Sequence, residues 1–203
     1  VGCQDNELLM ASDRVIGACT TIGDIWAKNT ILALGASESA RKLAPRVARS
    51  ILVRPVKGYS LTYNTTAVDD LPSYPVNDDR MHVAIVPIND KLRTVGIAEF
   101  AGYDDTLSPQ IFRHLDRLTK SVYPNLAQTI DSCKQEPWVG FRPMSADGLP
   151  YIGETSSKGL WVNTGHGHLG WTLAAGSAEL LADLIMRKSA ALDASTFTVT
   201  RST

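Results

Sequence analysis

Residues 160–172 read LWVNTGHGHLGWT, and this stretch decides the fold. The apolar run of residues 160–163 predicts a short buried strand. Three glycines follow within residues 165–170, and they let the backbone turn tightly and approach a ligand closely. The apolar residues beyond them predict a long helix that ends near Lys188. The sequence therefore predicts a strand, a glycine turn and a helix in direct succession.

The start of this helix is suited to an anion. Its first backbone N–H groups have no partner within the helix, and they carry about half a positive charge. A ligand that is anionic, or becomes so, would be stabilised there. A glycine turn that only leads into a surface helix is the alternative. His166 and His168 lie in the turn, but no third ligand stands at a suitable spacing, so the pattern favours hydrogen-bonding histidines over a metal site.

Two further segments contain candidate binding residues. Residues 138–153 read WVGFRPMSADGLPYIG, where Arg142 stands between an aromatic residue and Pro143. A guanidinium group matches a carboxylate with two parallel hydrogen bonds, so Arg142 is a candidate carboxylate clamp. A structural arginine that pairs with Asp147 or caps a loop is the alternative. Residues 31–37, ILALGAS, predict a strand end followed by a turn at Gly35 and Ala36, a place where open α/β sheets bind ligands.

The composition narrows the class of protein. The chain has 203 residues, of which 44% are hydrophobic, so it has material for a core. Its net charge is -1, so nothing in its charge suggests a nucleic-acid partner. The three cysteines include no CxxC pair, which favours neither disulfides nor zinc and fits a reducing cytoplasm. Glu179 and Asp183 interrupt the most apolar stretch, which indicates an amphipathic helix rather than a membrane span.

The remaining pattern predicts an α+β fold. We expect strands within residues 14–34, 51–63, 82–86, 94–100 and 133–141, helices over residues 37–44 and 108–123, a loop over 142–153 and a loosely held tail from Ser189. The second helix has an apolar stripe of Ile111, Leu115, Leu118 and Val122. No G-x-G-x-x-G motif follows a strand, so the chain contains no complete dinucleotide-binding βαβ unit.

Four segments resemble a known family in the right order along the chain. They are KGYSLT (57–62), GIAEFAGY (96–103), GFRPMSADGLP (140–150) and NTGHGHLGWT (163–172). The last two are specific, and together they are similar to the amino-acid-oxidising flavoenzymes of the D-amino-acid oxidase superfamily. The first and the last point, within it, to the bacterial D-amino-acid dehydrogenase branch.

The resemblance implies the C-terminal part of a two-domain FAD-dependent amino-acid oxidoreductase. Residues 1–56 would belong to the FAD-binding domain and residues 57–137 to a substrate domain with an antiparallel sheet. Residues 138–188 would return to the FAD-binding domain with the flavin-facing turn and helix, and residues 189–203 would form a tail. The family's G-x-G-x-x-G unit would lie on an N-terminal half, here absent or on another chain.

The resemblance also assigns site residues and assigns no metal. Arg142 would bind the substrate carboxylate, and His166 is the second candidate catalytic residue. Met81 stands where relatives carry a tyrosine, and it would line the substrate pocket with Arg142 and Pro143. The residues expected to contact FAD are Gly35, Ala36, Gly165, His166, Gly167, His168, Leu169, Gly170, Trp171 and Thr172.

The implied activity is oxidative deamination of a D-amino acid to a 2-oxo acid and ammonia. The hydride would pass to N5 of FAD and the electrons to a quinone-type acceptor, in the cytoplasm or on the inner face of the cell membrane. One alternative is another amine oxidase of the superfamily, such as a glycine or sarcosine oxidase or a proline dehydrogenase. The other is a non-catalytic fragment or split subunit that needs a partner.

Overall fold

The structure is a computed structural model that describes residues 5–36, 42–43, 50–66, 68 and 71–201. It confirms the α+β class, with three sheets and two longer helices among the described residues. The chain forms two compact units. Unit 1 comprises residues 1–55 and 142–203, and unit 2 comprises residues 56–141.

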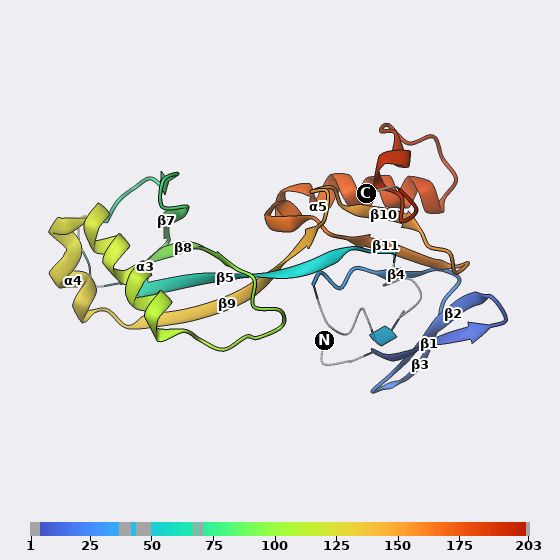
Figure 1. Cartoon of the computed structure of the whole chain (residues 1–203), viewed down its shortest axis with the longest axis horizontal. Helices are drawn as coiled ribbons and strands as arrows, with labels where there is room; N and C mark the ends of the chain where they lie inside the picture. The colour runs from blue at the N-terminus through green and yellow to red at the C-terminus, as the bar shows by residue number, and fades with distance from the viewer. Residues whose placement is uncertain (1–4, 37–41, 44–49, 67, 69–70, 202–203) are drawn as a thin grey trace. The chain divides into compact units, whose positions relative to one another are not determined.

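Most of the elements are labelled in Figure 1. The strands are β1 (Asp5–Ala11), β2 (Arg14–Thr20), β3 (Gly23–Trp26), β4 (Thr30–Leu32), β5 (Val53–Asn64), β6 (Val76–Asp78), β7 (Val83–Ile88), β8 (Lys91–Glu99), β9 (Gln135–Ser145), β10 (Tyr151–Glu154) and β11 (Leu160–Thr164). The helices are α3 (Pro109–Val122), α4 (Ala127–Ser132) and α5 (Gly170–Ile185), with 3-10 turns η1 (Pro124–Leu126), η2 (Gly167–Leu169) and η3 (Ala194–Phe197).

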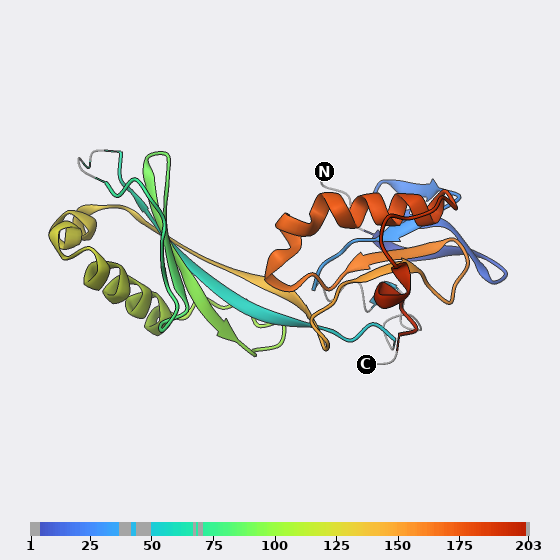
Figure 2. The same cartoon turned by 90° about the horizontal axis from the view of Figure 1, so that it is seen from above.

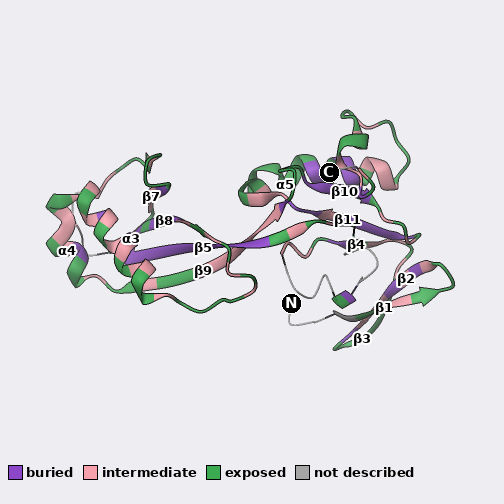
Figure 3. Ribbon diagram, viewed as in Figure 1, coloured by how far each residue is buried: buried purple, intermediate pink, exposed green. Residues whose placement is uncertain are grey.

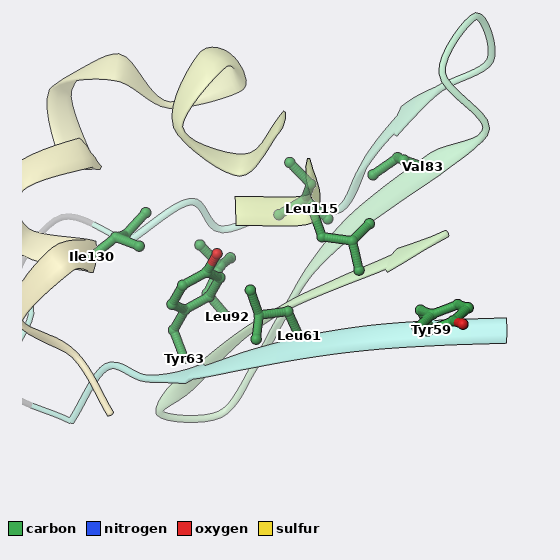
Figure 4. Packing of buried hydrophobic residues seen from close by; sticks show 8 residues of the cluster. Tyr59, Leu61, Tyr63, Val83, Leu92, Leu115 and Ile130 are labelled. Atoms are coloured by element: carbon green, nitrogen blue, oxygen red, sulfur yellow. The ribbon is translucent and has the colours of Figure 1, made fainter. Parts of the chain in front are cut away.

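Unit 2 is a five-stranded sheet covered by α3. The strand order is β6-β7-β8-β5-β9, and the pairs β6–β7, β7–β8 and β5–β8 are antiparallel. The predicted apolar stripe of α3 faces the sheet, where alternate residues of β5 point toward it. Figure 4 shows Tyr59, Leu61 and Tyr63 of this strand beside Leu115 of the helix. All four side chains are buried, so this unit has one continuous core.

Unit 1 contains two sheets and the long helix. The first sheet has the order β10-β11-β4, in which β11 pairs with β4 in parallel and with β10 antiparallel. The second is the antiparallel meander β1-β2-β3. Figure 2 shows α5 running along β10 and β11. Ile152 and Trp161 of the sheet pack against Leu180 and Leu181, in the second half of α5.

Four predictions about the elements need correction or lie outside the described residues. The prediction of one loop over residues 142–153 is wrong, because β9 continues to Ser145 and β10 begins at Tyr151. The prediction of a loosely held tail is wrong for its described part, which forms η3 and contains Arg201, whose side chain is hydrogen-bonded. The last helix ends earlier than predicted, at Ile185. The predicted helix over residues 37–44 lies outside the described residues except for positions 42 and 43.

Within the described ranges, no helix is long and apolar enough to cross a membrane. Cys19 and Cys133 are free thiols. Cys3 lies outside the described residues.

Candidate functional site

Two glycine turns meet at one edge of the parallel strand pair in unit 1. Gly35 and Ala36 follow β4, and Gly165 follows β11, so both turns stand at the carboxyl ends of neighbouring parallel strands. The hydroxyl of Thr164 donates a hydrogen bond of 3.0 Å to the carbonyl of Gly35 and links the turns directly. Ligands of α/β sheets bind beyond the carboxyl ends of parallel strands. The two turns at the ends of β4 and β11 are therefore the candidate ligand-binding site.

The turn after β11 requires glycine for two reasons. Gly165 has φ +84 and Gly167 has φ +59, which is the left-handed region that favours glycine. A Cβ atom on Gly165 would lie 3.1 Å from Val53 Cγ2, and one on Gly167 would lie 3.1 Å from the sulfur of Met144. The backbone of this turn is therefore pressed against the strands behind it, and its conformation is fixed by the packing.

The helix that follows leaves its start open. No side chain caps η2 at His166 or α5 at Leu169. Figure 3 shows the first turns of α5 as exposed, and the indole of Trp171 is 95% exposed. Leu169 and Leu173 expose part of their apolar surface as well. This end of α5 therefore combines backbone donors that no side chain satisfies with an apolar surface, which suits a flat, partly apolar ligand with an anionic edge.

The two histidines of the turn have different surroundings. His168 is exposed, whereas His166 is half-buried and its backbone forms an antiparallel bridge with Met144. The Nε2 atom of His166 is buried and has no hydrogen-bond partner among the described residues. Burial lowers the pKa of His166, which favours the neutral imidazole at neutral pH. A buried ring nitrogen without a partner is costly, so it suits a site that a ligand completes.

The candidate substrate residues belong to different parts of the chain. Arg142 and Pro143 lie in β9, and both side chains are half-buried. Burial lowers the pKa of Arg142. Met81 lies in unit 2, in the turn between β6 and β7, where it lines an apolar cavity of about 180 Å³ with residues of β6, β7 and α3. The grouping of Met81 with Arg142 and Pro143 in one pocket stays a prediction.

Sequence reasoning missed the partner of Asp147. Its carboxylate is bound by Arg201, with 2.7 Å between Arg201 Nε and Asp147 Oδ2. The alternative of an Asp147 pair with Arg142 therefore loses its support, because Asp147 is engaged by another arginine. No local signal links two residues that stand so far apart in the sequence. Among the described residues, no cluster of three or more acidic, histidine or cysteine side chains could hold a metal ion.

Comparison with known proteins gives consistent matches. The model of the FAD dependent oxidoreductase family DAO matches residues 6–184. A D-amino acid dehydrogenase of Vibrio atlanticus is 42% identical over 166 residues, which are 82% of this chain and 39% of the relative. One of Cereibacter sphaeroides is 42% identical over 178 residues, 88% of this chain and 40% of the relative. The chain therefore spans about two fifths of these relatives.

Solved structures give a similar result. Glycine oxidase from Geobacillus kaustophilus matches with a TM-score of 0.82 and 28% identity, over 99% of this chain and 52% of that one. L-Proline dehydrogenase from P. horikoshii matches with a TM-score of 0.80 and 16% identity, over 98% of this chain and 53% of that one. The second likeness shows the fold alone.

Proposed function

Because the chain belongs to the DAO family of FAD-dependent oxidoreductases, we propose that it is the C-terminal part of a D-amino acid dehydrogenase. In this proposal the full-length enzyme oxidises a D-amino acid to an imine, which water hydrolyses to a 2-oxo acid and ammonia, whereas this chain alone would be inactive. When bound, FAD would supply the two-electron acceptor for the hydride of the α-carbon, and a quinone-type compound would be the final electron acceptor. We place the protein in the cytoplasm, and a quinone-type acceptor would hold it on the inner face of the cell membrane.

The observation that carries the proposal is the open start of α5 beside two joined glycine turns. The turns at Gly35 and Gly165 are linked by Thr164, and α5 starts without a side-chain cap. These residues fit a flavin, because exposed Trp171 and Leu169 offer apolar surface and the free N–H groups favour negative charge at its pyrimidine edge. Gly167, His168, Gly170 and Thr172 would complete this contact along the turn.

Arg142 and His166 have distinct proposed roles. Arg142 would bind the substrate carboxylate with its guanidinium fork and so orient the α-carbon. The unpartnered Nε2 of His166 would accept or donate a hydrogen bond to the flavin or the substrate. A neutral His166 can do either, depending on which ring nitrogen carries the proton.

Replacing Arg142 tests the proposal. In the full-length enzyme, Arg142→Ala should lower kcat/KM for D-amino acids at least about a hundredfold, since a charge-assisted pair to the carboxylate is lost. The matched control is Arg117→Ala, which removes an exposed arginine of α3 and should leave kcat/KM unchanged. Activity of Arg142→Ala within a few-fold of the unmodified enzyme would refute the clamp.

Unit 1 supports the further proposal that an N-terminal half completes it, on the same chain or on another. β4 is the last strand of the sheet β10-β11-β4, so no described strand pairs with its outer edge. Parallel strands are normally covered on both faces, yet Ile31 in β4 is partly exposed. Beside it lies an apolar cavity of about 240 Å³, lined by residues of β2, β3 and β4. An FAD-binding βαβ unit would pair with this edge and supply most of the affinity for FAD.

An amine oxidase of the same superfamily is the second candidate function. The 28% identity to a glycine oxidase over 99% of this chain favours it. The two candidates differ in electron acceptor, so oxygen consumption and dye reduction measured over a panel of D-amino acids and glycine would separate them. Dye reduction without oxygen consumption supports the dehydrogenase, and oxygen consumption with glycine supports the oxidase. A colourless protein that stays inactive after addition of FAD would instead favour a split subunit.

A further inference from the structure

Arg201, near the C-terminus, forms an unusually complete set of contacts. Its Nε and Nη2 atoms donate to the two carboxylate oxygens of Asp147 at 2.7 and 3.0 Å. Nη2 also donates to the carbonyl of Leu149 at 2.7 Å, and Nη1 donates to the carbonyl of Pro150 at 3.0 Å. The side chain is only 8% exposed. The last turn of the chain is therefore fastened to the loop that joins β9 to β10.

The same guanidinium group stacks on an aromatic ring. Its carbon lies 3.6 Å from the ring centroid of Tyr151, the first residue of β10. Arginine is the residue that combines a planar fork with such stacking, whereas lysine offers only a point charge. The hydrogen bonds and the stacking of Arg201 both involve one short segment, residues 147–151, which forms the loop before β10 and its first residue.

The buried ring of Tyr151 also packs against the glycine turn of the candidate site. A Cβ atom on Gly165 would lie 3.4 Å from Tyr151 Cδ2 and 3.5 Å from the Cβ of Ser145. The Tyr151 hydroxyl accepts a long hydrogen bond of 3.4 Å from the N–H of Leu52. The ring is thus held from several sides: it stacks on Arg201, and Tyr151 pairs with Thr164, the residue before the turn, across β10 and β11.

We propose that Arg201 is a positioning residue that fixes the glycine turn after β11 through the ring of Tyr151. The contact with Arg201 restrains the ring, and the ring supports the backbone of Gly165, which must keep a left-handed conformation. The part of the proposal that concerns the flavin rests on the proposed function. The part that concerns the turn does not, because all of these contacts lie within unit 1.

Hydrogen exchange of the chain without FAD tests the proposal. In Arg201→Leu, the amides of residues 165–169 should exchange about tenfold faster, because the turn opens more often by local unfolding. Arg201→Lys should lie between Arg201→Leu and the unmodified chain, since it keeps the charge but loses the fork and the stack. The amides of β1 and β2, in the same unit, should be unaffected in both variants.

The matched control is Lys158→Ala, which breaks the ion pair with Asp13 in the same unit. These two side chains are 68% and 70% exposed, so this pair lies at the surface. The control should leave exchange at the turn unchanged. Unchanged exchange at the turn in both Arg201 variants would overturn the proposal, as would an equal rise over β1 and β2. If Arg201→Leu does not fold, Arg201→Lys decides by the same criterion.

A second measurement separates this inference from the proposed function. In the FAD-loaded full-length enzyme, Arg201→Lys should shift the flavin absorption spectrum or midpoint potential, whereas Lys158→Ala should not. Faster exchange at the turn without such a shift, in an enzyme that binds FAD, would overturn the link to the flavin. If the full-length protein bound no FAD, the proposed function would fail, while the exchange result would still decide on Arg201.

Discussion

Unit 2 and unit 1 differ in how they use their apolar residues. In unit 2 the sheet and α3 enclose one core, with Leu115, Ile130, Leu92 and Tyr63 all at 0% exposure. In unit 1 the core is divided into two smaller clusters. The first turns of α5, which contain the candidate site, leave Trp171 almost fully exposed.

The difference shows which unit can be stable without further contacts. Unit 2 has one continuous buried core, although Tyr74, Phe100 and Trp138 lie exposed outside it. We therefore expect its fold to depend little on a ligand. Unit 1 places uncapped helix donors, an unpartnered His166 nitrogen and apolar side chains at one end of a sheet. These features cost stability until something covers them, so we expect unit 1 to gain most from FAD and from an N-terminal half.

The largest expected effect is the loss of stability on replacing a buried leucine of α3, compared with a partly exposed leucine of α5. Leu115→Ala in α3 removes a fully buried side chain and should lower the free energy of unfolding by about 3 kcal/mol. Leu173→Ala in α5, where the side chain is 38% exposed, should cost less than about 1 kcal/mol. Urea denaturation of both variants measures the difference, and equal costs would contradict the contrast between the units.

The next effect concerns the glycine turn. Gly165→Ala should cost about 2 kcal/mol, because alanine is strained at φ +84 and its Cβ would approach Val53. Gly176→Ala in α5 is the control, since a Cβ atom there would meet nothing within 4 Å. It should be neutral or stabilise the chain by up to about 1 kcal/mol, through helix propensity. Thermal unfolding compares the two, and a harmless Gly165→Ala would remove the argument for a fixed turn.

A smaller effect depends on pH. The hydrogen bonds from Arg201 lower the pKa of Asp147 to about 2, whereas a free aspartate has about 3.9. Because the folded pKa is the lower one, the contribution is complete above about pH 5 and is lost as the pH falls toward about 2. Since Asp147 is partly exposed, we expect about 1 kcal/mol.

Asp147→Asn provides the comparison for this pH effect. The free energy of unfolding of the unmodified chain should fall more steeply between pH 5 and about 2.5 than that of the variant. Urea titrations at the two pH values measure both slopes. Parallel slopes would show that the ion pair with Arg201 adds no pH-dependent stability.

The smallest effect is expected at the most exposed tryptophan. Trp171→Ala should change the free energy of unfolding of this chain by less than about 0.5 kcal/mol, because the side chain is 95% exposed. In the full-length protein the same change should weaken FAD binding, since the indole would contact the flavin. Fluorescence titration with FAD measures this, and an unchanged Kd would remove Trp171 from the site.

Local patterns predicted the parts of the fold that depend on neighbours in the sequence. The spacing of Ile111, Leu115, Leu118 and Val122 predicted α3 and its buried face, and the glycines of residues 165–170 predicted the turn into α5. The hairpin of β7 and β8 contains the two predicted strands of residues 82–86 and 94–100, and it turns between them at Asn89, which has φ 53.

The misses depend on contacts that are distant in the sequence. Pro143 suggested a loop, but β9 is the last strand of its sheet, and an edge strand tolerates a residue without an N–H donor. Arg201 and Asp147 are separated by 54 positions, so only the folded chain brings them together. The buried Nε2 of His166 could not be predicted either, because the burial of a single ring atom depends on the folded chain around it.

Hydrogen exchange with and without FAD tests most directly whether the open start of α5 is the flavin site. The measurement uses this chain joined to the proposed N-terminal half. FAD should slow exchange at the amides of residues 165–176 by about tenfold or more and leave α3 unchanged. Equal exchange in α5 with and without FAD, in a protein that is shown to bind it, would contradict the account.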